Sequence, residues 1–423
     1  PVERAVIAPG DLTSQYYPLQ MFATRELAAG RLPAWDPFMN AGQPGLADIQ
    51  TGAFYPLNLL PNLVLPLLGL PFSVELLTAQ IVLHFSLASL FMYLFVRRVA
   101  CRIGARAPVA RFAGVVAALT FTYAGFLTSF PPQQLTVLET AVWLPLILYS
   151  LDRALYAAHP RPQLIFAGMA LACALLAGHP QTAMYVVYCS LAYVVFLAWT
   201  LRGRFRGSRL FLLFVPFALG LALAAVQLVP TLAFIARSTR AHLDYETVAW
   251  GFPLIETVHL IFPSNLGGSP QYVGILPLIL SVAALFLRQA RTLIAFWIAV
   301  GAVALLLSFG GHTLFYDLAF SLLPGFAVVR NQERIIFLFS FAVSVLAGLG
   351  ALVLAQPLPR PLRLRSERFW RSLGWIGIVL LVVAPLVYYA QTRGLGVEVN
   401  LATDVLRQHT VLLLFLSGAV ALV

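Results

Sequence analysis

Long apolar runs alternate with short polar connections along almost the whole chain after residue 71. A helix needs about 20 apolar residues to cross a bilayer, because ~30 Å of hydrocarbon is covered at a rise of 1.5 Å per residue. Three of the runs (138–151, 164–178 and 274–287) are short, so the ends of those helices must extend into neighbouring residues. The pattern predicts an all-α, polytopic bundle of about eleven transmembrane helices, at roughly 72–96, 112–130, 138–151, 164–178, 182–201, 210–235, 274–287, 292–309, 335–355, 373–390 and 409–423.

The connections between these runs alternate in charge. One set carries eighteen of the 27 basic residues, all of them Arg, against two acids, Asp152 and Glu367. The other set carries nine Arg and fourteen acids. Because Arg-rich loops stay in the cytoplasm, this asymmetry predicts a multi-pass protein whose Arg-rich loops face the cytoplasm, as in an inner (cytoplasmic) membrane. The long connections then lie on the exoplasmic side, at 1–71, 236–273, 310–334 and 391–408.

The same pattern predicts two parts. Residues 1–71 form a first exoplasmic loop with interfacial, juxtamembrane helices, and residues 72–423 form a transmembrane helical domain. The chain begins inside a predicted exoplasmic loop and ends inside an apolar run. We therefore expect a span before Pro1 and further residues after Val423.

Composition supports a lipid-solvated protein. Hydrophobic residues make up 60% of the chain and charged residues 10%, with a mean hydropathy of +0.87. Soluble domains carry about 25% charged residues, so a protein surrounded by water on all sides is excluded, as are a disordered chain, collagen and a coiled coil. The net charge of +11 comes from short loops that face anionic headgroups, and it does not call for a nucleic-acid partner. The three cysteines indicate neither a disulfide framework nor a metal site.

The first loop contains the most polar detail. A helix is predicted from about Ser14 to Ala29, with Thr13 or Ser14 as its cap and Gly30 after its end. The segment 57–70 is apolar but interrupted by Pro61 and Pro66, which predicts an interfacial or re-entrant piece.

Asp11, at the start of this helix, is the residue with the clearest chemical potential. A carboxylate there could bind a cation or act as a general base. On residue physics alone, helix capping is the more common role for such an Asp. Asp48 and Gln50 are turn residues by default and are candidates for contacts with an acceptor substrate.

Several strings, in order along most of the chain, resemble the YfhO family of bacterial membrane proteins, which is similar to glycosyltransferases of the GT-C fold. The strings are Gly10-Asp11-Leu12-Thr13-Ser14-Gln15-Tyr16-Tyr17-Pro18, Gly30-Arg31-Leu32-Pro33-Ala34-Trp35-Asp36-Pro37, Gly42-Gln43-Pro44-Gly45-Leu46-Ala47, Phe54-Tyr55-Pro56-Leu57, Ala177-Gly178-His179-Pro180-Gln181, Gln271-Tyr272-Val273-Gly274, Leu323-Pro324-Gly325-Phe326 with Arg330 and Arg334, and Ala347-Gly348.

The resemblance implies transfer of a sugar carried on a polyprenyl phosphate, with the active site at the exoplasmic face. It also implies that Asp11 is the catalytic or metal-associated carboxylate of the first loop, with a divalent cation such as Mg or Mn as a candidate cofactor. No soluble C-terminal domain, of the kind many GT-C enzymes have, is evident in this chain.

Four further positions are candidates. Arg330 and Arg334 are four residues apart, which predicts one helical face and two guanidinium groups that could hold a lipid phosphate; headgroup contact or pairing with an acid is the alternative. His179 and Gln181, in a short exoplasmic turn, could line the acceptor side, although a lone loop His is more often a turn residue.

Glu139 is expected to contact a helix N-terminus. The chain contains no nucleotide-binding or hydrolase motif.

These observations favour a membrane glycosyltransferase. In this hypothesis Asp11 acts as base or metal ligand, Arg330 and Arg334 hold the donor phosphate, and Asp48, Gln50, His179 and Gln181 line the acceptor side. The alternatives are a lipid or solute transporter or flippase, and a non-catalytic subunit of a membrane complex. Transport ranks lower because the predicted spans have almost no charge at their centres and no visible repeat. The sugar and the acceptor are not specified by the sequence.

Overall fold

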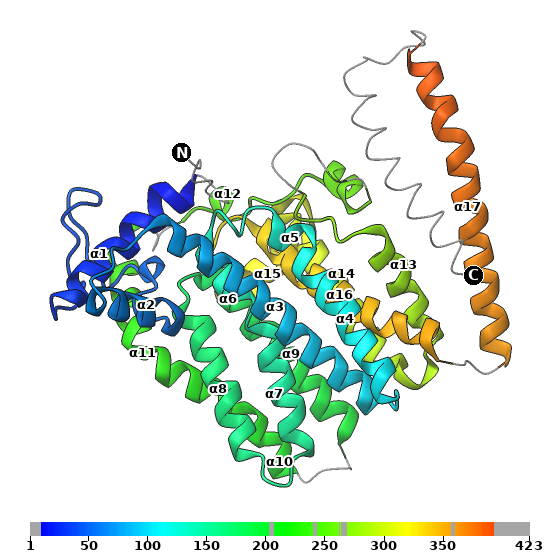
Figure 1. Cartoon of the computed structure of the whole chain (residues 1–423), viewed down its shortest axis with the longest axis horizontal. Helices are drawn as coiled ribbons and strands as arrows, with labels where there is room; N and C mark the ends of the chain where they lie inside the picture. Colours follow the sequence, from blue (N-terminus) through cyan, green and yellow to red (C-terminus); the bar gives the residue numbers. More distant parts are fainter. Residues whose placement is uncertain are drawn as a thin grey trace.

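The computed structural model describes residues 10–202, 207–239, 243–261, 263, 269–356 and 360–392. Helices dominate these residues, and the only strand-like pairing among them is an isolated bridge between Asp36 and Gln43. Figure 1 shows α1 and α2 together at the left edge of the bundle, α12 and α5 near its upper end, α10 at its lower end, and α17 at the right edge. The predicted all-α class is confirmed for the described residues.

Within the described residues, seven helical segments are long and apolar enough to cross a membrane. They are α3 (Val74–Arg102), α4 (Ala107–Tyr123) with α5 (Gly125–Thr128), α6 (Leu135–Ala141) with α7 (Leu144–Tyr156), α9 (Pro180–Leu201), η3 (Leu212–Phe214) with α11 (Val215–Ile235), η7 (Arg288–Ala290) with α14 (Arg291–Ser308), and η9 (Gln332–Ile335) with α16 (Ile336–Ala355). Each of the seven coincides with a predicted apolar run, so the chain is a membrane protein with several spanning-capable helices.

The other four predicted spans have different outcomes. The runs 164–178 and 274–287 form shorter apolar helices, α8 (Arg161–Leu176) and α13 (Ile275–Ala283) with η6 (Ala284–Phe286). The 16 residues of α8 rise only ~24 Å at 1.5 Å per residue, less than the ~30 Å hydrocarbon core. The run 373–390 lies within α17 (Arg360–Thr392), which is not among the seven, and 409–423 lies outside the described residues.

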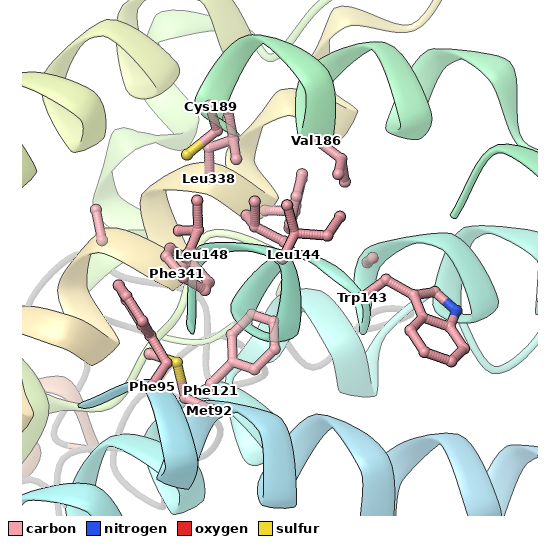
Figure 2. Close-up of a cluster of buried hydrophobic side chains, with 14 of the residues drawn as sticks. Met92, Phe95, Phe121, Trp143, Leu144, Leu148, Val186, Cys189, Leu338 and Phe341 are labelled. Atoms are coloured by element: carbon pink, nitrogen blue, oxygen red, sulfur yellow. The ribbon is translucent and has the colours of Figure 1, made fainter. Parts of the chain in front are cut away.

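The centre of the bundle is built by two of these segments. In the most apolar windows of Gln332–Ala355 and Leu135–Tyr156, 94% and 89% of the residues are buried, against 28% in Leu212–Ile235. Figure 2 shows side chains of α3, α4, α7, α9 and α16 meeting in this core, among them Phe95, Phe121 and Phe341. The rings of Phe95 and Phe341 are 6.1 Å apart, and those of Phe121 and Phe341 5.5 Å. Because lipid tails are as apolar as these residues, close packing rather than escape from solvent holds the helices together.

A buried ion pair ties three helices together at one end of the bundle. Asp152, near the end of α7, is fully buried and accepts hydrogen bonds from Arg98 Nε at 2.9 Å, from Arg102 Nη1, and from the Tyr193 hydroxyl at 3.2 Å. Arg98 also lies over the ring of Tyr156. We call Asp152, Arg98, Arg102 and Tyr193 the inner clamp. It lies at the C-terminal ends of α3 and α7, the end that the Arg-rich loops predict to be cytoplasmic.

The first loop packs on the opposite ends of α3 and of the α6–α7 segment. It contains η1 (Leu12–Tyr16), α1 (Tyr17–Ala28), η2 (Ile49–Thr51) and α2 (Pro56–Leu67). The predicted helix from Ser14 to Ala29 is present but begins earlier. The hydroxyls of Thr13 and Ser14 donate to the Gly10 carbonyl and cap no amide, so the predicted cap is wrong.

α2 has an inverted face. Its two buried residues are Asn58 and Asn62, both fully buried, whereas Leu67 is 86% exposed and Leu60 60% exposed. A helix in water shows the reverse pattern. The leucine face of α2 therefore suits contact with lipid, and its asparagines belong to the protein interior. The remaining connections carry α12 (Tyr245–Val248), η5 (Leu254–Leu260), η8 (Gly310–His312) and α15 (Leu314–Leu322); α10 (Gly207–Phe211) lies at the other end.

Candidate functional site

Asp11 begins the helical segment of the first loop and is exposed to solvent. Its backbone is helical, and its side chain accepts no capping hydrogen bond from the helix. The capping role expected for Asp11 on residue physics alone is therefore absent. Its Oδ2 atom instead accepts a long hydrogen bond, 3.4 Å, from Nε2 of Gln134. Asp11 thus offers a solvent-facing carboxylate tied to the transmembrane bundle by one weak contact.

Gln134 joins this carboxylate to Arg334. While its Nε2 faces Asp11, its Oε1 accepts a hydrogen bond of 3.1 Å from Nη2 of Arg334. A single carboxamide therefore separates the acid of the first loop from the guanidinium group before α16. The two opposite charges are held near one another without forming a direct ion pair.

Arg334 is fixed by a second carboxamide on its other side. Its Nη1 donates to Oε1 of Gln181 at 3.2 Å, and Nε2 of Gln181 donates to the Asn331 carbonyl at 3.1 Å and to the Tyr185 hydroxyl at 2.9 Å. Both hydrogen-bond partners of the guanidinium group are neutral, so they orient its charge without pairing with it, while the adjacent carboxylate of Glu333 acts on it electrostatically. Such a group retains donors for an anion such as phosphate. We call Asp11, Gln134, Arg334 and Gln181 the outer relay.

Arg330 does not share a helical face with Arg334, so that prediction is wrong. Asn331 lies between them in the left-handed region, with φ 61°, and η9 begins only at Gln332. The turn breaks the spacing that would align residues four apart. Arg330 is exposed and forms no hydrogen bond or ion pair with another described residue. Its charge is nevertheless close enough to be felt by Arg334.

Asp48 and Gln50 organise the first loop locally. Asp48 accepts hydrogen bonds from the Gln50 amide at 3.0 Å and from the Gln43 side chain at 3.2 Å, and so caps η2. Oε1 of Gln50 accepts from Gln15 Nε2 at 2.7 Å, which ties η2 to η1. The contacts of Asp48 are those of a turn residue, which is its default role.

His179 is also engaged by its own helix. It is buried, and its Nδ1 accepts the Thr182 backbone amide at 3.1 Å and lies 2.7 Å from the Thr182 hydroxyl. His179 is therefore the N-cap of α9. The preceding Gly178 packs on η2, since a Cβ there would lie 2.5 Å from the Ile49 carbonyl oxygen. The structure thus brings the His179 turn and the Gln50 segment together, while only Gln181 of this turn contacts Arg334.

Two residues of this region were missed by sequence reasoning. Gln134 is one of them, because a carboxamide that bridges two charged groups has no signature in the sequence. Tyr16 is almost fully buried, and its hydroxyl lies 3.1 Å from the hydroxyl of Thr136. Burial raises the pKa of Tyr16 to about 12, and the nearby charge of Asp11 also raises it. Tyr16 therefore stays protonated.

Glu139, which was expected to contact a helix N-terminus, lies in the second turn of α6, is fully buried, and accepts its hydrogen bond from the Asn58 side chain. Among the described residues, no group of three or more His, Cys, Asp or Glu side chains could hold a metal ion. A metal ion at Asp11 would therefore find no cluster of three such protein ligands among the described residues. A Mg or Mn ion at Asp11 would have to take its other oxygens from a substrate phosphate, which is a common mode for Mg²⁺.

The family model described as bacterial membrane protein YfhO matches residues 1–422. No curated protein and no solved structure matches the chain.

Proposed function

Because the chain belongs to the YfhO family of bacterial membrane proteins, we propose that it transfers a sugar from a polyprenyl-phosphate-linked donor to an acceptor on the exoplasmic face of the bacterial inner membrane. One observation carries this proposal. The outer relay holds a solvent-facing carboxylate and a guanidinium group with neutral hydrogen-bond partners on the two sides of one carboxamide. Glycosyl transfer from a lipid phosphate needs a base and an anion clamp at such a short separation.

In the proposed reaction, an acceptor hydroxyl attacks the anomeric carbon of the sugar. A new carbon–oxygen bond forms there while the bond from that carbon to the phosphate oxygen breaks, and its electron pair leaves with the lipid phosphate. Asp11 takes the proton of the hydroxyl as general base. Arg334 stabilises the charge that grows on the departing phosphate, and the exposed Arg330 adds to the local positive field.

The remaining predicted residues have supporting roles in this proposal. Gln181 fixes Arg334, and Gln50 and His179 lie on the neighbouring segments that would face the acceptor. Asp48 holds Gln50 in place through its capping bond. A Mg or Mn ion, if bound, would be held by Asp11 and the donor phosphate and would neutralise phosphate charge.

The test uses the full chain in lipid vesicles with a panel of radiolabelled polyprenyl-phosphate hexoses and an envelope-derived acceptor fraction. We expect transfer by the wild type and a loss of about 10²–10⁴-fold in Asp11→Asn, the size typical of a general base. Binding of polyprenyl phosphate itself should be unchanged in this variant. Arg153→Gln, an exposed Arg close to the inner clamp, is the control and should behave as the wild type.

Full activity of Asp11→Asn would remove Asp11 from the mechanism. If the wild type neither transfers any hexose of the panel nor binds polyprenyl phosphate, the enzymatic proposal fails. The chain would then act as a transporter or as a non-catalytic subunit of a membrane complex.

A further inference from the structure

A second polar network lies buried where the first loop meets the bundle. Nε1 of Trp143 donates to the Tyr55 hydroxyl at 3.0 Å, and that hydroxyl lies 2.8 Å from Nε2 of His84. Nδ1 of His84 lies 2.6 Å from the Gln80 carbonyl oxygen, which can only accept. Nδ1 of His84 therefore donates to this carbonyl. Because burial in an apolar interior disfavours the charged ring, Nε2 is unprotonated and accepts the Tyr55 proton. Burial raises the pKa of Tyr55 well above its usual range, in agreement with a phenol that donates.

This chain of bonds makes His84 a neutral imidazole. One ring nitrogen acts as donor and the other as acceptor, which is the pattern of the uncharged ring. His84 therefore supplies no positive charge to its neighbours.

A branch of the network ends on Glu139. Nε2 of Gln80 donates to Oδ1 of Asn58 at 3.0 Å, and Nδ2 of Asn58 donates to Oε2 of Glu139 at 3.4 Å. Asn58 and Glu139 are fully buried, and Gln80 is 3% exposed. The three residues come from α2, α3 and α6, so the branch connects the first loop to two separate spans.

This branch contains more hydrogen-bond acceptors than donors. Oε1 of Gln80 and Oε1 of Glu139 are both buried and have no hydrogen-bond partner among the described residues. Both residues are bonded to the same Asn58, one on each side of its carboxamide. An unpaired buried acceptor is costly, and an unpaired buried carboxylate costs still more.

No charged group compensates Glu139. The titratable groups around it are neutral His84 on α3, the phenols of Tyr55 and Tyr16 on the first loop, and Cys173 beyond Tyr55. Asp11 and Arg334 lie on the other side of Tyr16, in the outer relay. No Arg forms an ion pair with Glu139 within the described ranges, whereas Asp152 has two.

We propose that Glu139 is a proton-binding site in the membrane-embedded bundle, where its carboxyl group carries a proton that it donates to Oε1 of Gln80. A proton turns the unpaired Oε1 of Glu139 from an acceptor into a donor, and so removes both unpaired acceptors at once. A metal ion fits less well, because Mg²⁺ and Ca²⁺ take six or more oxygens and Glu139 is the single carboxylate here.

The bound proton acts on the first loop. Tyr55 and Asn58, both from the segment that begins α2, are anchored by this network. Loss of the proton would leave a charge and a second unpaired acceptor in an apolar interior, so the anchored form of the loop requires the protonated site. The proposal assigns Glu139 a role separate from the outer relay and does not depend on sugar transfer.

Two measurements on the full chain test the proposal. The first is the infrared carbonyl band of a protonated carboxylic acid, recorded at neutral pH for the wild type, Glu139→Gln and Asp152→Asn. We expect the band in the wild type and in Asp152→Asn and its loss in Glu139→Gln. An identical band in all three proteins, or no band in the wild type, overturns the proposal.

The second measurement is thermal stability. In Glu139→Gln, the new side chain keeps an acceptor for Asn58 and supplies an N–H group for Gln80, as the protonated acid does. We therefore expect its unfolding midpoint to match that of the wild type at neutral pH and to stay constant at alkaline pH, where the wild type falls. Glu139→Leu, which removes both bonds, should be less stable than either.

Glu139→Gln no more stable than Glu139→Leu would contradict a protonated acid, because it would mean that the ionised form is the one that fits. Wild-type stability that rises with sodium chloride but not with choline chloride would assign the site to a metal cation and would equally overturn the proposal.

Discussion

The inner clamp and the outer relay each combine an Asp with Arg, but they differ in whether these charged groups touch. In the inner clamp, Asp152 contacts two Arg directly and is fully buried. In the outer relay, Asp11 and Arg334 never touch, because the carboxamide of Gln134 lies between them. Both assemblies join segments far apart in sequence, and both contain one acid with Arg at the end of a span.

The difference lies in what happens to charge. In the inner clamp the one buried carboxylate is paired directly with two Arg, so these contacts serve the fold. A neutral bridge fixes positions and leaves each charge able to act on a third group, which is what a site for an anionic substrate needs. The hydrogen-bond partners of an Arg therefore distinguish a structural Arg from a functional one, which the residue type alone cannot do.

Asp152→Asn should have the largest effect on the inner clamp. Removing one partner of a buried ion pair leaves uncompensated charge and costs about 3–5 kcal/mol of unfolding free energy. The thermal midpoint of the purified protein in detergent should fall strongly, while Arg153→Gln, an exposed neighbour, should leave it unchanged. An unaltered midpoint for Asp152→Asn would mean that the inner clamp does not support the fold.

Gln134→Glu turns the outer relay into a copy of the inner clamp. The new carboxylate would pair directly with Arg334 and repel Asp11, so the guanidinium charge would be cancelled. We expect binding of polyprenyl phosphate to vesicle-reconstituted protein to weaken by about 10–100-fold, the range of a lost charge-assisted contact, with no loss of thermal stability. Unchanged binding would show that Arg334 does not meet the phosphate.

Arg330→Gln should have a smaller effect. Arg330 is exposed and has no fixed partner among the described residues, so its contribution is long-range and screened by salt. We expect a weakening of polyprenyl phosphate binding by less than about fivefold, as for an exposed charge worth under ~1 kcal/mol. The effect should vanish at high ionic strength, and a loss that persists in salt would place Arg330 in direct contact with the ligand.

The pair of Glu26 and Arg31 should give the smallest effect. Two hydrogen bonds from Arg31, both 2.9 Å, lower the pKa of Glu26. Any stability from this pair is present above the ordinary carboxyl pKa and is lost as the pH falls through the lowered one. Because both groups are exposed, solvent screens the pair, and Glu26→Gln should have the thermal midpoint of the wild type from about pH 7 to pH 5.

Hydrophobic patterning predicted most of the helical organisation. Nine of the eleven apolar runs coincide with spanning-capable or shorter apolar helices, because period and length suffice to mark such segments. Patterning marked the runs of α8 and α13 as short, but it could not show that these helices stay short, since helix ends depend on turns such as that at Gly178. The sidedness deduced from the Arg-rich loops stays a prediction.

The candidate site was predicted less completely. Sequence reasoning selected Asp11 and Arg334, which the structure connects through Gln134. It also aligned Arg330 with Arg334, and this failed because the left-handed turn at Asn331 leaves no trace in residue spacing. Glu139 was placed at a helix start, since a sequence does not reveal that the first loop folds over α6 and buries it.

The inverted face of α2 has a consequence for biogenesis. The described residues leave Leu60 and Leu67 exposed, so this helix needs hydrocarbon around it to reach its folded position. In an aqueous extract the segment would sooner turn its leucines inward and expel Asn58 and Asn62, which would dismantle the anchoring of the first loop. The choice of detergent or nanodisc lipid thus decides whether the isolated protein keeps its working architecture.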